Sequence, residues 1–431
     1  MTPRRTDHYP FLPGTTPPMI VGAEGSHLIT ADGRRILDAA GGAVVTNIGH
    51  GRPEPMEAAV TAPVDYVVPT WATESRLELI ERLQTAWLPS GVVRCMFVTG
   101  GSEAVDAAVR IARLHQVAAG RPARWKVLGQ SVSYHGATLG TLAVANHDRR
   151  RAHLDPLLPD QPKWAAFDIG DLADLIDRED PASVAAVVLE PVSGASGAAL
   201  TPPPGYLVQV RELCREHGIV MIADEVMTGF GRTGAPFAVD HEAVVPDLLV
   251  GGKGLGGGYA PIGLVAATEE LVAPIAAAGL EVMYHTFSAS EISCRVANTV
   301  LRIMETERLV DRAAAMGERL AAALTAAAAD HPHVAEVRGL GLLRGVELVA
   351  DRASGAGFGG RLTPLVVAEA LARGVWIYPA GSGPVPDGLL FGPPFTITNG
   401  EIDEIATVTV AAVDAAVATL AAAGGPGSAA P

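Results

Sequence analysis

The sequence predicts an α/β fold in which a mostly parallel β-sheet is covered by helices on both faces. Short, wholly apolar runs at residues 184–189 and 248–250 are typical of strands that are buried on both sides. Segments with helical character alternate with such runs through the middle third of the chain, and this alternation favours parallel pairing. The chain has 431 residues, of which 48% are hydrophobic, so it can form two or three domains around a large core.

Composition limits the classes of function. A net charge of −15 argues against binding to nucleic acid or to anionic membrane surfaces, because both interactions need basic patches. Cys95, Cys214 and Cys294 are widely spaced, form no metal-binding pattern and indicate reduced thiols in a cytoplasm. The N-terminus lacks the apolar core of a signal peptide, and we find no run of eighteen apolar residues that would predict a transmembrane helix.

The N-terminal part of the chain is predicted as an arm, a hairpin and a helix. Residues 1–18 are rich in proline, which favours an extended arm over a helix. Residues 20–37 resemble a small hairpin with Asp32-Gly33 in its turn. Residues 74–88 have the apolar spacing of an amphipathic helix.

The next unit is a strand, a glycine turn and a helix. Residues 92–98 are the strand, Gly100-Gly101-Ser102 is the turn, and the helix runs to about His115. Ser102 is the expected N-cap, and the free N–H groups at the start of this helix can hold a phosphate. An ordinary capped helix without a ligand is the alternative interpretation.

Three further strands are each followed by polar side chains. A strand at residues 126–128 leads to Tyr134 and His135, which could meet a flat ligand or serve only as hydrogen-bonded loop residues. Residues 184–189 end at Glu190, and a strand beginning at Ile219 ends at Asp224. A carboxylate at the end of a buried strand is costly unless it is paired, so we expect Asp224 to meet a positive group.

Lys253 follows directly after the strand at 248–250 and lies among glycines. Partial burial makes a lysine amine easier to deprotonate and more nucleophilic, which predicts Schiff-base chemistry with a carbonyl compound. A solvated loop lysine is the simpler alternative. The sequence does not match the motif of a phosphate-binding nucleotide loop, because Gly254 follows the lysine where the motif requires serine or threonine. A dinucleotide-binding glycine pattern lacks a clear strand, turn and helix around it.

Six candidate residues therefore follow strand ends. Ligands bind beyond the carboxyl ends of the strands in parallel sheets, so these residues are expected on one rim. They are Gly101, Ser102, Tyr134, Glu190, Asp224 and Lys253.

The C-terminal part predicts a second, smaller domain. An apolar run at 262–267 and helices near 292–304 and 309–329 precede it. Apolar runs at 340–348 and 375–378 flank a helix at 363–373, and a last helix starts near Asn399. Residues 421–431 have the composition of a disordered tail.

Together the motifs resemble those of the class III aminotransferases, which are pyridoxal-phosphate enzymes of fold type I. The resemblance spans about residues 20–415 and is most specific in the Asp224–Gly234 string, DEVMTGFGRTG, followed by KGLGGG from Lys253. It is also carried by Gly100-Gly101-Ser102-Glu103-Ala104, Tyr134-His135-Gly136 and Glu190-Pro191-Val192. The family implies a large domain with a mostly parallel seven-stranded sheet between helices, and a smaller α+β domain from the N- and C-terminal segments.

The resemblance implies a role for each matching residue. Lys253 would form the Schiff base with pyridoxal 5′-phosphate and then move the proton, and Asp224 would pair with the pyridine nitrogen. Tyr134 and Val226 would cover the two ring faces. The remaining cofactor contacts would be Gly101 and Ser102 at the phosphate, Glu190 near the ring oxygen, His135, and Thr286 reaching the phosphate across a homodimer interface.

The resemblance also implies boundaries and a reaction. We expect an arm and part of the small domain at 1–65, the large cofactor-binding domain at 66–305, the small domain at 306–420 and the tail at 421–431. An amine or amino acid would donate its amino group, and a keto acid, aldehyde or ketone would accept it in a second half-reaction. The alternatives are an aminomutase, a racemase or a decarboxylase on the same scaffold. A cofactor-binding protein without turnover and a nucleotide-binding protein are rivals of other classes.

One position departs from the family pattern. Many members carry an arginine that clamps a substrate carboxylate three residues before the Pro-Pro pair, and here Leu390 occupies that position. An apolar side chain offers no bidentate fork. The sequence is closer to the broad ω-aminotransferase group, whose members take less polar amines or bind a substrate carboxylate in another way. Trp71 lies where that group lines the substrate entrance, and a core tryptophan is the alternative.

Overall fold

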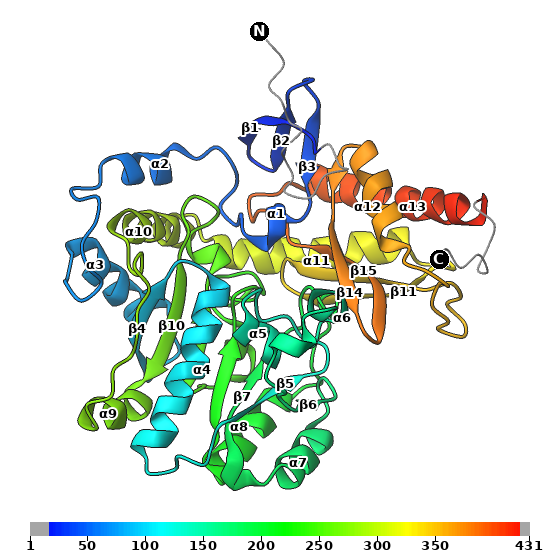
Figure 1. Cartoon of the computed structure of the whole chain (residues 1–431). Coiled ribbons are helices and arrows are strands. Elements are labelled where there is room, and N and C mark those ends of the chain that lie inside the picture. Colours follow the sequence, from blue (N-terminus) through cyan, green and yellow to red (C-terminus); the bar gives the residue numbers. More distant parts are fainter. Residues whose placement is uncertain (1–16, 423–431) are drawn as a thin grey trace.

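A computed structural model describes residues 17–422 (Figure 1). All but the last two residues of the predicted arm at 1–18 lie outside the described residues. The predicted tail at 421–431 also lies outside them, except that Ala421 and Ala422 belong to the last helix.

A seven-stranded sheet forms the centre of the molecule, as predicted. Its strand order is β4-β10-β9-β8-β7-β5-β6, and every strand is parallel to the others except β10, which is antiparallel to both neighbours. The strands are β4 (Val92–Val98), β5 (Lys126–Gln130), β6 (Lys163–Trp164), β7 (Val184–Leu189), β8 (Val220–Asp224), β9 (Leu248–Gly251) and β10 (Gly263–Thr268). The parallel strands therefore end at one edge, where the candidate residues begin.

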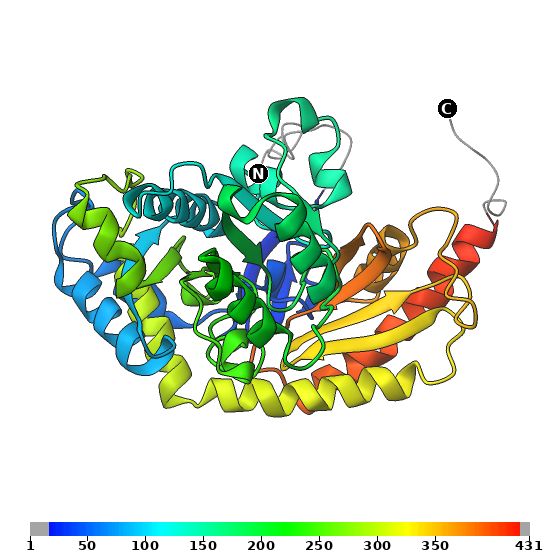
Figure 2. The same ribbon diagram turned by 90° about the horizontal axis from the view of Figure 1, so that it is seen from below.

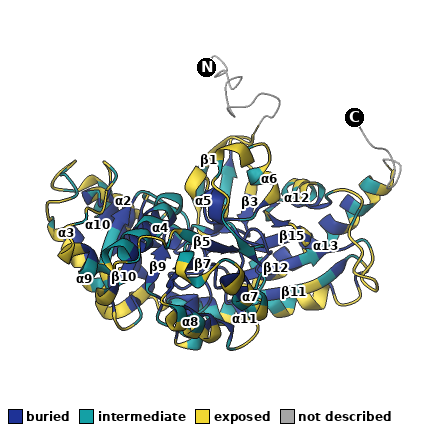
Figure 3. Cartoon of the chain, turned by 60° about the horizontal axis from the view of Figure 1, so that its bottom comes forward, coloured by how far each residue is buried: buried dark blue, intermediate teal, exposed yellow. Residues whose placement is uncertain are grey.

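Helices cover both faces of this sheet, because alternate side chains of each strand point to opposite sides. In β7, Ala186 and Val188 pack with helix α4 (Gly101–Ala118), whereas Val187 and Leu189 pack on the other face. That second face is covered by α7 (Ile169–Arg178), α8 (Tyr206–His217) and α10 (Glu291–Thr306). Figure 3 shows the buried strands between these partly exposed helices.

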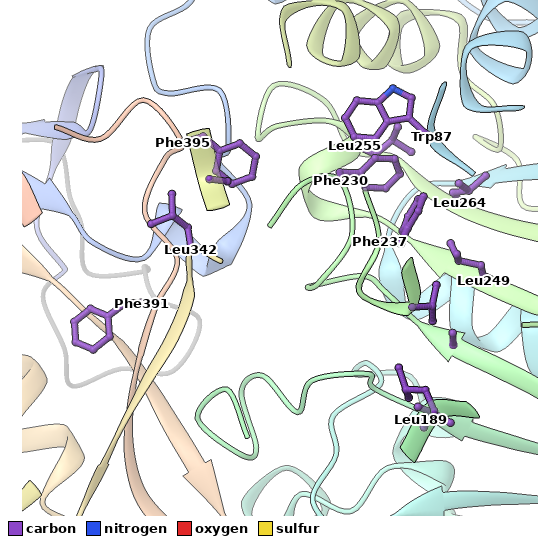
Figure 4. Packing of buried hydrophobic residues seen from close by; sticks show 14 of the residues in the cluster. Trp87, Leu189, Phe230, Phe237, Leu249, Leu255, Leu264, Leu342, Phe391 and Phe395 are labelled. Atoms are coloured by element: carbon purple, nitrogen blue, oxygen red, sulfur yellow. The ribbon is translucent and has the colours of Figure 1, made fainter. Parts of the chain in front are cut away.

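Aromatic side chains fill the core on the second face. The Phe230 ring lies 5.1 Å from that of Phe237 and 5.9 Å from that of Trp87, measured between centroids. Figure 4 shows these rings beside Leu255, which lies two residues after Lys253. The loop that carries Lys253 therefore rests on a packed aromatic base.

Two four-stranded sheets accompany the central one. The first joins β1 (Ile20–Glu24), β2 (His27–Thr30) and β3 (Arg35–Asp38) to β13 (Val375–Trp376). The pairing of β3 with β13 brings the N- and C-terminal parts of the chain side by side (Figure 1). The second sheet contains β11 (Val334–Leu340), β12 (Leu343–Leu348), β15 (Val385–Phe391) and β14 (Tyr378–Ser382). The predicted domain boundaries at 65, 305 and 420 stay predictions.

One local prediction was wrong, and another is confirmed with a change of helix type. The predicted hairpin at 20–37 contains three strands, because Gly25 adopts a φ of +58° and adds a turn between β1 and β2. The predicted helix at 74–88 is present, but it is an α-helix only over α3 (Glu74–Arg82). Residues Leu83–Trp87 continue it as a π-helical turn. Both Leu83 and Trp87, at the two ends of this turn, are buried.

Three helices pack beside the second small sheet. Helix α11 (Leu309–Ala327) runs along the lower edge of the molecule in Figure 2. It packs against α13 (Asn399–Ala422), which also packs against α12 (Thr363–Ala372). Helix α13 is long and apolar enough to cross a membrane by length and composition alone. It nevertheless buries one face, including Ile402, Ile405 and Val413, as the helices of a globular core do.

The remaining helices are shorter. They are α1 (Gly41–Val44), α2 (Pro53–Val60), α5 (Leu139–Val144), α6 (Asp148–Arg151) and α9 (Glu269–Ala277).

Candidate active site

A cavity of about 240 Å³ opens at the carboxyl ends of the parallel strands. Eight of the residues predicted to contact a cofactor line it. They are Gly101 and Ser102 after β4, Tyr134 and His135 after β5, Glu190 after β7, Asp224 and Val226 at and after β8, and Lys253 after β9. The structure thus brings residues separated by up to 152 positions into one cavity, through the pairing of the strands that precede them.

The start of helix α4 forms one end of the cavity. Gly100, with extended backbone, is the N-cap, so the prediction that Ser102 caps this helix was wrong. Ser102 lies in the first turn, where its Oγ accepts a hydrogen bond from the Ala137 N–H at 3.1 Å. The first N–H groups of a helix have no partner within it, so this end of the cavity suits an anion.

Asp224 is held in the buried wall of the cavity by two hydrogen bonds. Its Oδ2 lies 2.7 Å from His135 Nδ1, and its Oδ1 accepts from the Val226 N–H at 3.1 Å. Asp224 and His135 are both buried. The partner that the structure gives Asp224 is thus an imidazole, which fixes the carboxylate in the cavity.

Glu190 lies beside this pair and is also buried. Its carboxylate accepts from the Tyr134 N–H at 2.9 Å and from the Gly194 N–H at 3.3 Å. Burial raises the pKa of Glu190 to about 7, and the charge of Asp224 adds to this, while His135 and the two N–H groups lower it. Glu190 is thus a carboxyl group that can hold or release a proton near neutral pH.

Lys253 opens a short 3₁₀ turn, Lys253–Leu255, with a backbone φ of +39°. This left-handed conformation disfavours any residue but glycine, so its occurrence at a lysine is typical of a functional site. Burial lowers the pKa of Lys253, and the charges of Asp224 and Glu190 oppose that effect. The amine is therefore more nucleophilic than that of an exposed lysine.

Two predicted residues lie outside this cavity. Thr286 is exposed in a turn between α9 and α10, and Trp71 is 66% exposed in a turn before α3. The exposure of Trp71 excludes a place in the core of this chain.

The cavity is also lined by two polar residues that the sequence did not single out. Arg150 comes from α6, and Tyr378 begins β14 of the second small sheet. The run Arg149-Arg150-Arg151 is visible in the sequence, but nothing in that run indicates that only Arg150 faces the cavity.

A partly buried lysine and a fixed carboxylate at the C-terminal rim of a mostly parallel seven-stranded sheet define the site class of fold type I pyridoxal-phosphate enzymes. Comparison with known proteins agrees with this class. The sequence profile of the family described as aminotransferase class-III matches residues 13–413. The chain is 36% identical to the uncharacterized aminotransferase YodT of Bacillus subtilis, over 92% of this chain and 96% of that protein.

Other relatives match the chain over similar lengths. The chain is 34% identical to an acetylornithine aminotransferase of Mycolicibacterium smegmatis, over 94% of this chain and 95% of the relative. Among solved structures, an (S)-enantioselective ω-transaminase from Thermomicrobium roseum has a TM-score of 0.87 and 32% identity, covering 96% of this chain and 97% of the other.

The chain belongs to the class III aminotransferases. It is a fold type I enzyme that uses pyridoxal phosphate to transfer an amino group from a donor to a carbonyl acceptor. The alternatives of aminomutase, racemase or decarboxylase are not favoured.

The cavity fits this cofactor. A Cβ built on Gly101 would lie 2.7 Å from Val226 Cγ1, so the glycine keeps open a narrow space beside the valine. The walls also supply an amine for an aldehyde, a carboxylate for a pyridine nitrogen, and a helix N-terminus for a phosphate.

Proposed function

We propose that the phosphate of pyridoxal phosphate binds at the start of α4, against the backbone of Gly101 and Ser102 and the hydroxyl of Ser102. Asp224 pairs with the pyridine nitrogen, since its carboxylate is held in the cavity wall by His135. His135 acts here as a positioning residue, because it reaches the ligand only through Asp224.

Tyr134 and Val226 enclose the ring from its two faces on this proposal. The absence of a side chain at Gly101 lets the ring approach Val226 closely. Glu190 lies on the ring-oxygen side, held by the N–H groups of Tyr134 and Gly194. Because its pKa is about 7, Glu190 can keep a proton and donate it to the ring oxygen of the cofactor when that oxygen is charged.

Lys253 performs the proton transfers. Bound pyridoxal phosphate supplies a carbonyl carbon for the amine and a ring that accepts the electrons left when the substrate α proton departs. Lys253 Nζ would hold the cofactor until a substrate amine takes its place. The freed Nζ would then accept the proton from the substrate Cα and return it, because its lowered pKa keeps the amine unprotonated and able to accept a proton. The amino group would pass from donor to acceptor in two such half-reactions.

One observation carries this assignment: an amine whose pKa is lowered by burial faces the same cavity as a carboxylate that is fixed by a buried histidine. The chain contains only three lysines, Lys126, Lys163 and Lys253, so the residue that holds the cofactor can be identified directly. Borohydride reduction of the yellow holoenzyme, followed by peptide mass mapping, should find the cofactor mass on Lys253. A K253A variant should lose the label, and a K126A variant should keep it.

Amino transfer itself is tested by the visible spectrum. We expect the cofactor absorbance to change when an amine donor is added and to recover when a 2-oxo acid is added, with the amino group found on the oxo acid. A label on Lys126 or Lys163, or a product that retains the donor's own amino group, would contradict the proposal.

We further infer that the enzyme is a homodimer in which Thr286 of one protomer reaches the phosphate held by the other. Large apolar side chains gather around Thr286: Phe287 is 64% and Met283 is 67% exposed. Tyr66 packs edge-on against Phe287 with ring centroids 6.1 Å apart, so two segments form one patch. Exposed apolar patches of this kind mark interaction surfaces.

Trp71 extends the same surface and is inferred to line the substrate entrance in the dimer.

A cytoplasmic location is inferred from the cysteines, because Cys95, Cys214 and Cys294 are all unpaired in the structure.

A further inference from the structure

The position where many class III aminotransferases carry their carboxylate-binding arginine is apolar in this chain. Leu390 is fully buried in β15 and belongs to an apolar cluster with Ala195 and Met227, which both line the active-site cavity. No cation can be offered from this position. A substrate carboxylate, if the enzyme takes one, must be held by a different side chain.

Arg150 reaches the same corner of the cavity from another element. Its Cζ lies 4.0 Å from the centroid of the Tyr134 ring, and its Nη2 donates to the hydroxyl of Tyr378 at 3.4 Å. Tyr378 is paired directly with Leu390 across the β14–β15 ladder. Directly opposite residues of an antiparallel pair project from the same face of a sheet, so the Arg150 guanidinium contacts the neighbour of Leu390.

The charges in the cavity leave Arg150 available. Asp224 is engaged by His135 and Glu190 by two backbone N–H groups, while Lys253 is required for the chemistry. Among residues 17–422, no carboxylate lies within ion-pair distance of Arg150. A guanidinium has five N–H donors in a planar fork that matches a carboxylate. Within the described part of the chain, the Arg150 side chain donates only one hydrogen bond, to the Tyr378 hydroxyl.

We propose that Arg150 binds the carboxylate of the substrate in place of an arginine at position 390. The enzyme's substrates are therefore amino acids and oxo acids, in at least one of its two half-reactions. Tyr134 and Tyr378 hold the guanidinium in place, the first through its ring and the second through its hydroxyl. This inference rests on the proposed function of the cavity, because it needs the substrate carbonyl to approach Lys253.

The test compares two acceptors with the same carbon chain, pyruvate and propanal, on the holoenzyme and on R150M. Loss of a charge-assisted bidentate contact should raise the KM for pyruvate roughly 10- to 100-fold. The KM for propanal should change less than about threefold, since an aldehyde has no group for the guanidinium. Binding of butyrate, which does not react, should weaken by a similar factor in calorimetric titration of the holoenzyme.

Three matched variants separate recognition from folding. Arg149 is the exposed neighbour, does not line the cavity and donates to the Gly381 carbonyl oxygen at 2.6 Å, so R149M should leave both KM values unchanged. R150K keeps the charge without the fork and should raise the KM for pyruvate less than R150M does. Y378F removes only the hydroxyl that positions Arg150, and it should raise the KM for pyruvate by a smaller factor than R150M does.

Two outcomes would overturn the proposal. In the first, R150M raises the KM for pyruvate and for propanal equally. In the second, it weakens pyridoxal phosphate binding, measured by equilibrium dialysis, without altering the ratio of the two KM values. The second result would assign Arg150 to the cofactor. Either result leaves the proposed function standing as long as reduction still labels Lys253 in the wild type, so the two failures are distinguishable.

Discussion

At the scale of single residues, two opposing effects determine the pKa of Lys253. Burial favours the neutral amine and so lowers the pKa, while the carboxylates of Asp224 and Glu190 favour the ammonium and raise it. The balance lies on the side of a lowered pKa. Removing one of the carboxylates should therefore lower the pKa further and make the amine more reactive in the cofactor-free protein.

We predict that D224N increases the labelling of Lys253 in the apoenzyme. Below its pKa, the free-amine fraction of a lysine rises tenfold for each unit by which the pKa falls, so loss of one nearby charge should speed carbamylation by cyanate roughly threefold at pH 7.5. Peptide mass mapping follows all three lysines in one experiment. Lys126 is the internal control, because its ion pair with Glu179 at 2.8 Å is a separate contact from the cavity. Slower labelling of Lys253 in D224N would contradict the assigned sign.

Gly101 tests the fit of the cofactor at the same scale. A methyl group at this position would lie 2.7 Å from Val226 Cγ1, whereas one at Gly252 would lie 3.4 Å from the same atom. G101A should therefore raise the dissociation constant of pyridoxal phosphate by roughly tenfold, from overpacking of about 1–3 kcal/mol. G252A is the matched control and should raise it less than about threefold. Equal constants for the two variants in equilibrium dialysis would show that Val226 does not limit the cofactor's approach.

At the scale of elements, the strands that carry the site are the best predicted. The runs at 184–189 and 248–250 match β7 and β9 to within one residue, because strands buried on both faces leave an unbroken apolar signal. Residues that follow such runs had to lie on the rim, which is why six cavity residues could be predicted from the strands, while His135 and Val226 were predicted only from the family resemblance. Apolar content alone does not give strand direction, so the antiparallel β10 could not be predicted.

Helix α6 shows what the sequence could not reveal. None of its four residues is buried, so it has no apolar periodicity to detect. Its contact from Arg150 to Tyr378 spans 228 positions and exists only because β14 packs beside the large sheet's rim. The Ser102 cap was misassigned for a related reason: Gly100 takes the capping position with its backbone alone, and no side chain marks it.

The contact between helix α11 and the β11–β12 turn gives a prediction at this scale. A Cβ on Gly317 would clash with the carbonyl of Gly341 in that turn, so G317A should destabilise the enzyme by about 1–3 kcal/mol despite alanine's higher helix propensity. Gly400 lies in the exposed first turn of α13 with open space around it. G400A should therefore stabilise by about 0.5–1 kcal/mol. Thermal unfolding of both apoenzymes tests this contrast, and a stabilised G317A would contradict it.

The whole molecule presents an apolar surface that a monomer does not explain. Val282, Met283 and Tyr284 are exposed in the segment before Thr286, and residues 69–70 line the same hollow as Val282 and Tyr284. This surface lies next to the first turn of α4, because His285 Nδ1 is 3.7 Å from the Glu103 carboxylate. A second copy docked here would cover the patch and bring its own Thr286 toward the phosphate end of the cavity, which links assembly to cofactor binding.

We therefore predict that F287E shifts the enzyme from dimer to monomer in analytical ultracentrifugation and raises the dissociation constant of pyridoxal phosphate at least about tenfold. Burying a carboxylate within an apolar interface is costly, and a monomer lacks the second Thr286. L157E alters a side chain that is 62% exposed in the turn after α6, so it should remain a dimer with unchanged cofactor affinity. T286V separates the two effects: it should stay dimeric and weaken only the cofactor. A monomeric F287E that binds cofactor as tightly as the wild type would show that each cavity is complete within one chain, and Thr286 would then have no part in the site.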